Sequence, residues 1–374
     1  FWLKSRPVVR TKHSACSVHT MMGAGGSSSA SKTSGDLVDA KRNPALARVA
    51  QDASLAEYKE GEHYRVVCLE SGSERRDLPI FATELGAVEM APTEAKVSAS
   101  RVDAPDVPGG FLLRDVLTPR ECDQILRLSE AMGYTEDAPV SLGRHIRQNE
   151  NCVILADDAL CGAIFERCKG LFPPEVEGGE VCGLNARWRL YKYNPSDIFR
   201  QHTDGSWPGS GLDASGNIIR DRYGDRWSQL TIVIYLNSDF EGGPTRFFIP
   251  TERREHRVAE IKADCGGAVC FYHGEHPLSP LHEGGLVTAG TKYIIRSDVL
   301  YKLPARGRDS LQSSWQQHYA QLQEEEVLRK LLARKDPEEL RKLVESVPPN
   351  ARGPLVAKLR ALAMAMQADE DEDD

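Results

Sequence analysis

The chain of 374 residues is 40% hydrophobic and 27% charged, which is ordinary for a globular protein and excludes collagen-like or wholly disordered chains. Its net charge is −8, and six of the negative charges lie in residues 369–374, so the rest of the chain carries −2 and we expect no broad cationic surface for nucleic acid. No run approaches the roughly 18 apolar residues of a membrane-spanning helix, so we expect no membrane span.

Residues 1–36 are rich in serine and glycine, carry basic side chains and contain no acidic residue before Asp36, so we predict a disordered leader. This composition also resembles an organelle transit peptide, and the run from Met22 to Ser27 resembles a myristoylation signal. The nine cysteines are scattered and include no C-x-x-C pair, which favours a reducing compartment over a disulfide framework. We therefore expect the cytoplasm, with a plastid or mitochondrion as alternatives that the leader leaves open.

Residues 37–109 form a small N-terminal region in which the sequence indicates no function. We predict a helix over Pro44–Lys59 and strands near Tyr64–Leu69 and Leu78–Phe81, because apolar and β-branched residues gather there between turn residues.

Local signals are sharper from residue 110 onward. Thr118-Pro119-Arg120-Glu121 is a capping box that predicts a helix ending near Gly133, and a second helix is predicted after Asp157 or Asp158. Between Cys182 and Leu303, apolar runs separated by turn residues predict strands at Arg187–Tyr193, Leu230–Asn237, Thr245–Ile249, Ala268–Tyr272 and Lys292–Arg296. This order of elements favours a β-sandwich or barrel braced by helices.

The end of the chain returns to a helical pattern. We predict helices over Ser313–Arg334, from Asp336 and Pro337 onward, and over Leu355–Met366. Residues 306–368 are thus expected to form a helical C-terminal region, followed by an acidic tail at 369–374.

The candidate chemistry begins at His202 and Asp204, which leave the same face of an extended segment because they are two residues apart. An imidazole and a carboxylate on one face can hold two positions of a divalent metal. A third ligand is available from His282, or from the loop histidines His273 and His276. Two histidines and one carboxylate form the facial triad of Fe(II) oxygenases, which leaves positions open for other ligands.

A cation near this site would bind the far carboxylate of a 2-oxo acid. Lys292 follows His282 by ten residues and can supply that charge. Arg296 lies on the same face of the predicted strand as Lys292, so it is a competing anchor.

The ordered motifs of this region resemble the catalytic domain of prolyl 4-hydroxylase-type Fe(II)/2-oxoglutarate dioxygenases. That family has a tyrosine nine residues before the first iron histidine and an aspartate two residues after it. It then has a Tyr-Leu strand end, an acidic-Gly-Gly-x-Thr stretch, and a histidine with a lysine ten residues later. The matching residues here are Tyr193, His202, Asp204, Tyr235, Glu241, Gly242, Gly243, Thr245, His282 and Lys292.

The resemblance implies an α+β domain over residues 110–305, with a double-stranded β-helix, or jelly-roll, core at 183–303 braced by N-terminal helices. It implies His202, Asp204 and His282 as iron ligands, with no acid or base catalyst beyond them. It further implies that 2-oxoglutarate and O2 are cosubstrates and that L-ascorbate is a further candidate cofactor. The residues implied to contact 2-oxoglutarate are Lys292 at its distal carboxylate, with Arg296 as the alternative, and Tyr193, Tyr235 and Thr245 as neighbours.

The expected reaction is hydroxylation of a substrate C–H with release of succinate and CO2, most simply on a prolyl residue of a protein or peptide. Two departures weaken the inference to proline: Phe199 replaces a common tyrosine, and residues 207–227 form an insert that we expect to alter substrate access. The alternatives are a dioxygenase of the same fold acting on another side chain or a small molecule, and a non-catalytic jelly-roll binding module. A zinc hydrolase would need Glu283 as its general base. The sequence predicts no oligomeric state.

Overall fold

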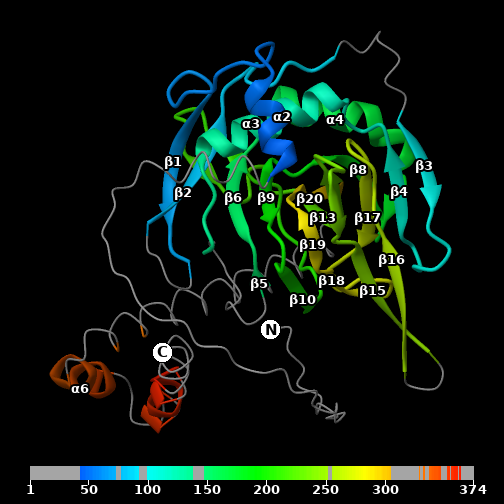
Figure 1. Cartoon of the computed structure of the whole chain (residues 1–374). Helices are drawn as coiled ribbons and strands as arrows, with labels where there is room; N and C mark the ends of the chain where they lie inside the picture. The colour runs from blue at the N-terminus through cyan, green and yellow to red at the C-terminus, as the bar shows by residue number, and fades with distance from the viewer. Residues whose placement is uncertain are drawn as a thin grey trace, which may run out of the picture. The chain divides into compact units, whose positions relative to one another are not determined.

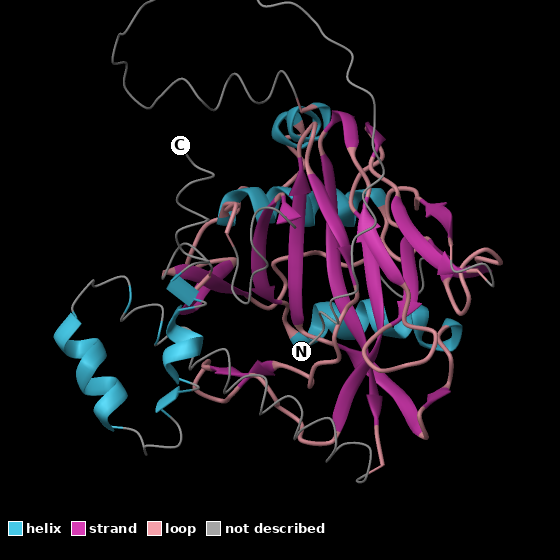
Figure 2. Cartoon of the chain, turned by 90° about the horizontal axis from the view of Figure 1, so that it is seen from below, coloured by secondary structure: helices cyan, strands magenta, loops and turns pink. Residues whose placement is uncertain are grey.

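The computed structural model describes residues 43–72, 77–91, 99–137, 147–251 and 255–304, and within the C-terminal region residues 328, 332, 337–346, 352–353, 355–360 and 362–363. The predicted leader at 1–36, the Met22–Ser27 signal, most of the predicted helix Ser313–Arg334 and the acidic tail lie outside the described residues. Strands dominate the part between residues 43 and 304, as Figure 2 shows.

A large mixed sheet forms the centre of the part between residues 43 and 304 (Figure 1). The strands of this sheet, in order of hydrogen-bonded pairing, are β1 (Tyr64–Glu70), β2 (Leu78–Thr83), β6 (Glu150–Leu155), β9 (Arg187–Tyr193), β20 (Lys292–Lys302), β13 (Arg226–Tyr235), β17 (Ala268–Tyr272), β4 (Phe111–Arg114) and β3 (Ser100–Asp103). Strand β8 (Gly179–Leu184) also pairs with β20, and β7 (Glu175–Val176) pairs with β8. Residues 37–109 therefore contribute three strands to the central sheet, at both of its ends.

A smaller antiparallel sheet lies below the large one in Figure 1. Its strands in order are β16 (His256–Ile261), β15 (Thr245–Pro250), β18 (Leu281–Gly284), β10 (Ile198–His202) and β5 (Arg147–Gln148). Two short two-stranded sheets stand apart from both: β11 (Gly211–Leu212) with β12 (Ile218–Ile219), and β14 (Phe240–Gly242) with β19 (Val287–Gly290).

The main hydrophobic core of the domain draws on both sheets. Buried side chains of the large sheet, such as Tyr193 and Tyr235, pack in one cluster with Phe247 of the small sheet. Alternation along β20 separates two environments: Lys292 and Ile294 point into this interior, whereas Tyr293 between them donates a hydrogen bond to Glu130.

Three helices cover the other face of the large sheet (Figure 1). These are α2 (Pro44–Gln51), α3 (Pro119–Met132) and α4 (Asp158–Cys168), and the short 3-10 turn η1 (Lys169–Leu171) follows α4. The predicted capping box is confirmed at α3: Thr118 accepts from the Glu121 N–H, and Glu121 accepts from the Thr118 N–H. The helix ends at Gly133, whose φ of 90° is readily adopted only by glycine.

The prediction for residues 44–59 was wrong in extent, because α2 ends at Gln51. The Asp52 carboxylate accepts hydrogen bonds from the backbone N–H and the hydroxyl of Ser54, at 2.9 and 2.6 Å, and this local turn competes with another helical turn. The strands predicted at Arg187–Tyr193 and Ala268–Tyr272 are confirmed with the same bounds. Strand β20 runs six residues beyond its predicted end at Arg296.

The chain divides into two compact units, one spanning residues 2–308 and the other comprising Phe1 and residues 309–374. The second unit contains α6 (Pro337–Ser346) and a small leucine cluster of Leu328, Leu359 and Leu362. None of the helices in the described part of the chain combines the length and apolar character needed to cross a bilayer. The eight cysteines within the described ranges are free thiols.

Candidate metal centre

The two histidines predicted as ligands are brought together by the register of the small sheet. His202 is the last residue of β10 and lies directly opposite His282 of β18, although 80 positions separate them in the sequence. Their ring centroids are 4.3 Å apart. Cross-strand pairing alone therefore places two imidazoles side by side at the edge of the interior.

Asp204 completes the cluster from the segment after β10. Its Oδ1 lies 3.8 Å from His202 Nε2, and its Oδ2 lies 3.7 Å from His282 Nε2. One ligand atom from each of the three residues falls within 4.8 Å of the others. His273 and His276 do not join this cluster: His273 lies behind Asp204, and the His276 ring stacks on Tyr272 at 3.9 Å.

The hydrogen bonds of the imidazoles leave their Nε2 lone pairs facing Asp204. His202 Nδ1 lies 2.8 Å from the Arg200 carbonyl, and His282 Nδ1 lies 3.2 Å from the Pro280 carbonyl. A carbonyl oxygen only accepts, so each Nδ1 carries the proton and each neutral ring keeps a lone pair on Nε2.

Electrostatics keep the three side chains in the protonation states that a metal requires. Burial lowers the pKa of His202 to about 3, and burial also lowers the pKa of His282. Burial opposes ionisation of Asp204, but the Arg296 guanidinium holds its pKa below the usual range. Two Nε2 lone pairs and a carboxylate would repel one another, and a divalent cation would satisfy all three. The residues present therefore fit the metal that the sequence predicted.

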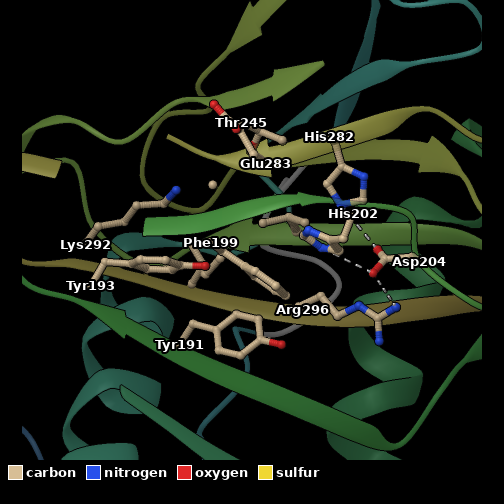
Figure 3. Close-up of a pocket in the computed structure, with 13 residues that line it drawn as sticks. Tyr191, Tyr193, Phe199, His202, Asp204, Thr245, His282, Glu283, Lys292 and Arg296 are labelled. Carbon is tan, nitrogen blue, oxygen red and sulfur yellow. Dashed lines mark ion pairs between the residues drawn. The ribbon is translucent and has the colours of Figure 1, made fainter. Parts of the chain in front are cut away.

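The pocket around this cluster lies between the two sheets (Figure 3). Its lining residues from the large sheet are Tyr191, Tyr193, Val233, Lys292, Ile294 and Arg296. Those from the small sheet and the segment after β10 are Phe199, His202, Asp204, Thr245, His282, Glu283 and Gly284. All eight residues that were predicted as metal or cofactor sites lie on or beside this pocket, although Tyr235 is not in its lining.

Lys292 is a buried cation in the pocket, only 2% exposed. Its Nζ donates to the Gly243 carbonyl at 2.7 Å and lies 5.1 and 5.0 Å from the ring centroids of Tyr193 and Tyr235. Burial, together with the charge of Lys262, lowers the pKa of Lys292 to about 7. Within the described ranges no carboxylate lies within ion-pair distance of Lys292, so an anionic ligand would stabilise its charged form.

Arg296 occupies the opposite end of the pocket and points toward Asp204 (Figure 3). Its Nη2 lies 3.3 Å from Asp204 Oδ1 and 3.2 Å from Asp298 Oδ1. The two candidate anchors, four residues apart on one strand, are therefore separated by about 13 Å of backbone. Arg296 already has two carboxylate partners, whereas Lys292 has none among the residues that the structure describes.

The remaining predicted neighbours form the wall near Lys292. The hydroxyls of Tyr235 and Thr245 are hydrogen bonded at 3.1 Å, and Tyr193 is buried beside them. Phe199, which replaces the tyrosine common in the resembled family, stacks on the His202 ring with centroids 3.8 Å apart. It therefore restrains a candidate ligand through ring contact.

Several residues of the site were not among those predicted from the sequence. Tyr191 and Val233 line the pocket, and Thr231 donates to Asp204 at 2.6 Å. The alternation of β9 and β13 could have suggested Tyr191 and Val233, because each lies two residues before a predicted tyrosine. Thr231 lies on the same face of β13, four residues before Tyr235, but the sequence does not indicate its hydrogen bond to Asp204.

The structure also shows the contacts of the insert at 207–227 and of Glu283. Arg220 in the insert at 207–227 bonds Glu70 of β1 at 2.9 Å, and Arg222 bonds Asp158 of α4 at 2.6 Å. The pocket lining contains no residue of this insert, so its influence on substrate access stays a prediction. Glu283 is paired with Arg246 at 2.6 Å, which leaves it poorly suited as the general base of a zinc hydrolase.

Comparison with protein-family models gives no match. Over 192 residues the chain is 27% identical to a protein of Acanthamoeba polyphaga mimivirus named "Putative prolyl 4-hydroxylase", which covers 49% of this chain and 71% of that protein. This similarity confirms that the chain is prolyl 4-hydroxylase-like, as its motifs indicated.

Solved structures with similar chains include a prolyl-4-hydroxylase of Pseudomonas putida (17% identity, TM-score 0.34), which covers 53% of this chain and 94% of its own. A Trichoplax adhaerens prolyl hydroxylase, solved with a hypoxia inducible factor peptide fragment, has 17% identity and a TM-score of 0.37 and covers 54% of this chain and 86% of its own. The viral collagen prolyl hydroxylase of Paramecium Bursaria Chlorella virus-1, solved with 2-oxoglutarate, has 16% identity and a TM-score of 0.34 and covers 57% of this chain and 100% of its own. Likeness at this level carries no conclusion about activity or substrate.

Proposed function

Because the chain is prolyl 4-hydroxylase-like, we propose that it is an Fe(II)/2-oxoglutarate-dependent dioxygenase whose two sheets form a double-stranded β-helix. The observation that carries this proposal is the cluster of His202, Asp204 and His282, with two neutral imidazoles and an ionised carboxylate within 4.8 Å of one another. Iron and 2-oxoglutarate, when bound, supply the oxidation, in which O2 is consumed, succinate and CO2 are released, and a substrate C–H becomes C–OH.

The chain's own residues bind and orient these groups. His202, Asp204 and His282 would hold the metal, and the backbone carbonyls of Arg200 and Pro280 fix the imidazole tautomers. His202 and His282 lie on paired strands, and Asp204 follows the end of β10 by two residues.

Lys292 is the proposed partner of the distal carboxylate of 2-oxoglutarate. It is a buried ammonium at the end of the pocket remote from Arg296, and an ion pair there would replace lost hydration. The hydroxyls of Tyr235 and Thr245 are near enough to share in this contact, and Tyr193 shields it from water. L-ascorbate stays a prediction from the resemblance, because no residue of the pocket is assigned to it.

The proposed substrate is a prolyl residue in a protein or peptide, supported by the name of the mimivirus relative. A dioxygenase acting on another side chain or a small molecule uses the same metal cluster. In the described part of the chain, Lys292 is buried without a carboxylate partner and lies beside three candidate metal ligands, and a non-catalytic binding module would have no need for this combination.

The experiment is anaerobic visible spectroscopy of the protein with Fe(II), to which 2-oxoglutarate is added. We expect a metal-to-ligand charge-transfer band in the natural protein and its loss in His282→Ala. His256→Ala is the matched control, because His256 is an exposed histidine on β16, and it should keep the band. Absence of the band, with neither iron nor 2-oxoglutarate binding, would overturn the proposal.

The substrate is then tested by coupled turnover. Proline-containing peptides and their Pro→Ala counterparts are incubated with iron, 2-oxoglutarate and O2, and succinate and peptide mass are measured. Gain of one oxygen only in the proline-containing member of a pair supports prolyl hydroxylation. Gain of one oxygen in both members would move the assignment to another side chain.

A further inference from the structure

Asp204 is linked by hydrogen bonds to buried polar side chains that have no role in the proposed chemistry. Thr231 of β13, which is fully buried, donates to Asp204 Oδ2 at 2.6 Å. His273, just after β17 and 1% exposed, places its Nδ1 2.9 Å from the Thr231 hydroxyl. The backbone N–H of Gly274 donates to the Asp204 carbonyl at 2.8 Å, so the same turn restrains both the main chain and the side chain of Asp204.

The direction of this chain of hydrogen bonds follows from the charge of Asp204. An ionised carboxylate only accepts, so the single proton of the Thr231 hydroxyl is directed to Asp204. Thr231 must then accept from His273, and the proton of His273 is on Nδ1. The result is a continuous relay of donors from His273 through Thr231 to Asp204, with each group in one orientation.

A second contact fixes the other oxygen of the carboxylate. Arg296 bridges Asp204 Oδ1 and Asp298 Oδ1, and Asp298 lies directly opposite Thr231 across the β13–β20 ladder. With His273 neutral, one positive and two negative charges leave this cluster with a net charge of −1. The cluster therefore restrains Asp204 without cancelling its attraction for a dication.

We propose that Thr231 and His273 are positioning residues, which hold Asp204 in its ligating orientation before the metal arrives. This inference rests on the proposed metal centre and deepens it. In unbound form a carboxylate on a short loop would sample several rotamers, and metal binding would have to select one. The relay fixes Oδ2 of Asp204 in advance and Arg296 fixes Oδ1, so the two contacts together remove that cost.

The alternative is that these side chains only satisfy one another in the core. Both roles predict a loss of stability when a hydroxyl is removed, so stability does not separate them. Metal affinity separates the two roles, because removal of the Thr231 hydroxyl weakens metal binding only if that hydroxyl orients Asp204.

The experiment measures Mn(II) binding to the metal-free full chain under anaerobic conditions without 2-oxoglutarate. Thr231→Val keeps the size of the side chain and removes the hydroxyl, and Thr231→Ser restores the hydroxyl. Thr83→Val is the matched control, because Thr83 is a buried threonine that donates to Asp157 at 2.9 Å at the start of α4. The thermal midpoint of each metal-free variant is recorded beside its Mn(II) dissociation constant.

We expect Thr231→Val to weaken Mn(II) binding by about 10- to 100-fold, the range typical of residues that support a metal ligand. Thr231→Ser should bind within about twofold of the natural protein, and Thr83→Val should lose stability with unchanged affinity. A His273→Leu variant should weaken binding in the same direction, and His273→Asn, which keeps a donor near the position of Nδ1, should restore part of it.

Unchanged Mn(II) affinity in Thr231→Val would overturn the inference while leaving the proposed metal centre intact. An equal loss of Mn(II) affinity in Thr231→Val and Thr83→Val would do the same. Failure of the natural protein itself to bind Mn(II) would overturn the proposed function and this inference together. Binding of Mn(II) without the charge-transfer band would count against the proposed dioxygenase alone.

Discussion

Lys292 is the residue whose environment most constrains the chemistry of the pocket. Its ammonium is surrounded by two tyrosine rings and a backbone carbonyl, and the charge of Lys262 adds to the cost of protonation. Burial and that charge lower its pKa to about 7, so the side chain is half protonated near neutral pH when no anion is bound. Binding of a carboxylate would favour the protonated form and raise this pKa.

The first prediction concerns the pH dependence of 2-oxoglutarate binding. Below pH 7 Lys292 is charged and binding is strongest, whereas above pH 7 a proton must be taken up, so affinity should fall by up to about tenfold per pH unit. His202, with a pKa of about 3, stays neutral throughout. Isothermal titration with Mn(II) present, from pH 6.5 to 8.5, measures this slope.

The variant that tests the same residue is Lys292→Met, which keeps length and removes charge. We expect 2-oxoglutarate to bind about thirtyfold more weakly at pH 6.5, equivalent to ~2 kcal/mol for a lost buried charge partner, and the slope above pH 7 to disappear. A slope that persists in Lys292→Met would assign the titration to another group, and full affinity would move the anchor to Arg296.

At the scale of elements, the register of β10 and β18 brings His202 and His282 of the proposed metal centre together, and α3 braces the opposite face of the large sheet. The Glu121 carboxylate of α3 makes two sets of contacts. It accepts a hydrogen bond from the Thr118 N–H in the capping box, and it accepts two hydrogen bonds of 2.7 Å from Arg167 of α4. Both partners of this ion pair are buried. The helix start and the packing of two helices therefore depend on one carboxylate.

We predict that Thr118→Ala lowers the free energy of unfolding by about 1 kcal/mol, the usual cost of a lost N-cap. Glu121→Ala should cost about 3–5 kcal/mol, because it leaves the Arg167 guanidinium buried without its partner. Urea unfolding measures both, with Mn(II) affinity as a control that should not change. Equal costs for the two variants would show that the Glu121–Arg167 pair contributes little.

The same pair predicts sensitivity to acid. Burial opposes ionisation of Glu121, but hydrogen bonds from Arg167, Thr118 and Ala91 hold its pKa below the ordinary glutamate value of 4.5. Its contribution to stability is therefore present above pH 4.5 and lost as the pH falls through the lower pKa of the folded state. Unfolding curves at pH 6 and pH 3.5 should differ less in Glu121→Gln than in the natural protein.

At the scale of the whole molecule, the unit spanning residues 2–308 contains the complete pocket and its own core. We predict that a chain ending at Arg308 folds and binds Mn(II) with the affinity of the full chain. Circular dichroism melting and Mn(II) titration test this. Aggregation of the shortened chain, or a clear loss of affinity, would show that residues 309–374 are needed by the first unit.

Local sequence signals determined several elements of this protein. The capping box at Thr118 and the glycine at 133 defined α3, and runs of β-branched and aromatic residues defined β9 and β17 with their observed bounds. Strands such as β10 and β18 were not predicted, because IFRQH and LHEG are short and rich in polar residues, and their pairing partners lie far along the chain. Their extended form depends on neighbouring strands in the sheet.

In the candidate site too, the sequence indicated some residues and the tertiary structure decided the roles of others. The spacing of His202, Asp204, His282 and Lys292 in the sequence, read through a family resemblance, pointed to one pocket before any fold was known. The roles of Thr231, His273 and Asp298 were decided by tertiary structure alone, because a threonine, a histidine and an aspartate on three separate segments meet only through strand register. Lys292 and Arg296 were equivalent as charges on one strand face; the structure separated them by giving Arg296 two carboxylates and Lys292 a buried pocket. Composition and spacing specify which groups are present, but the pairing of distant strands decides which of them meet.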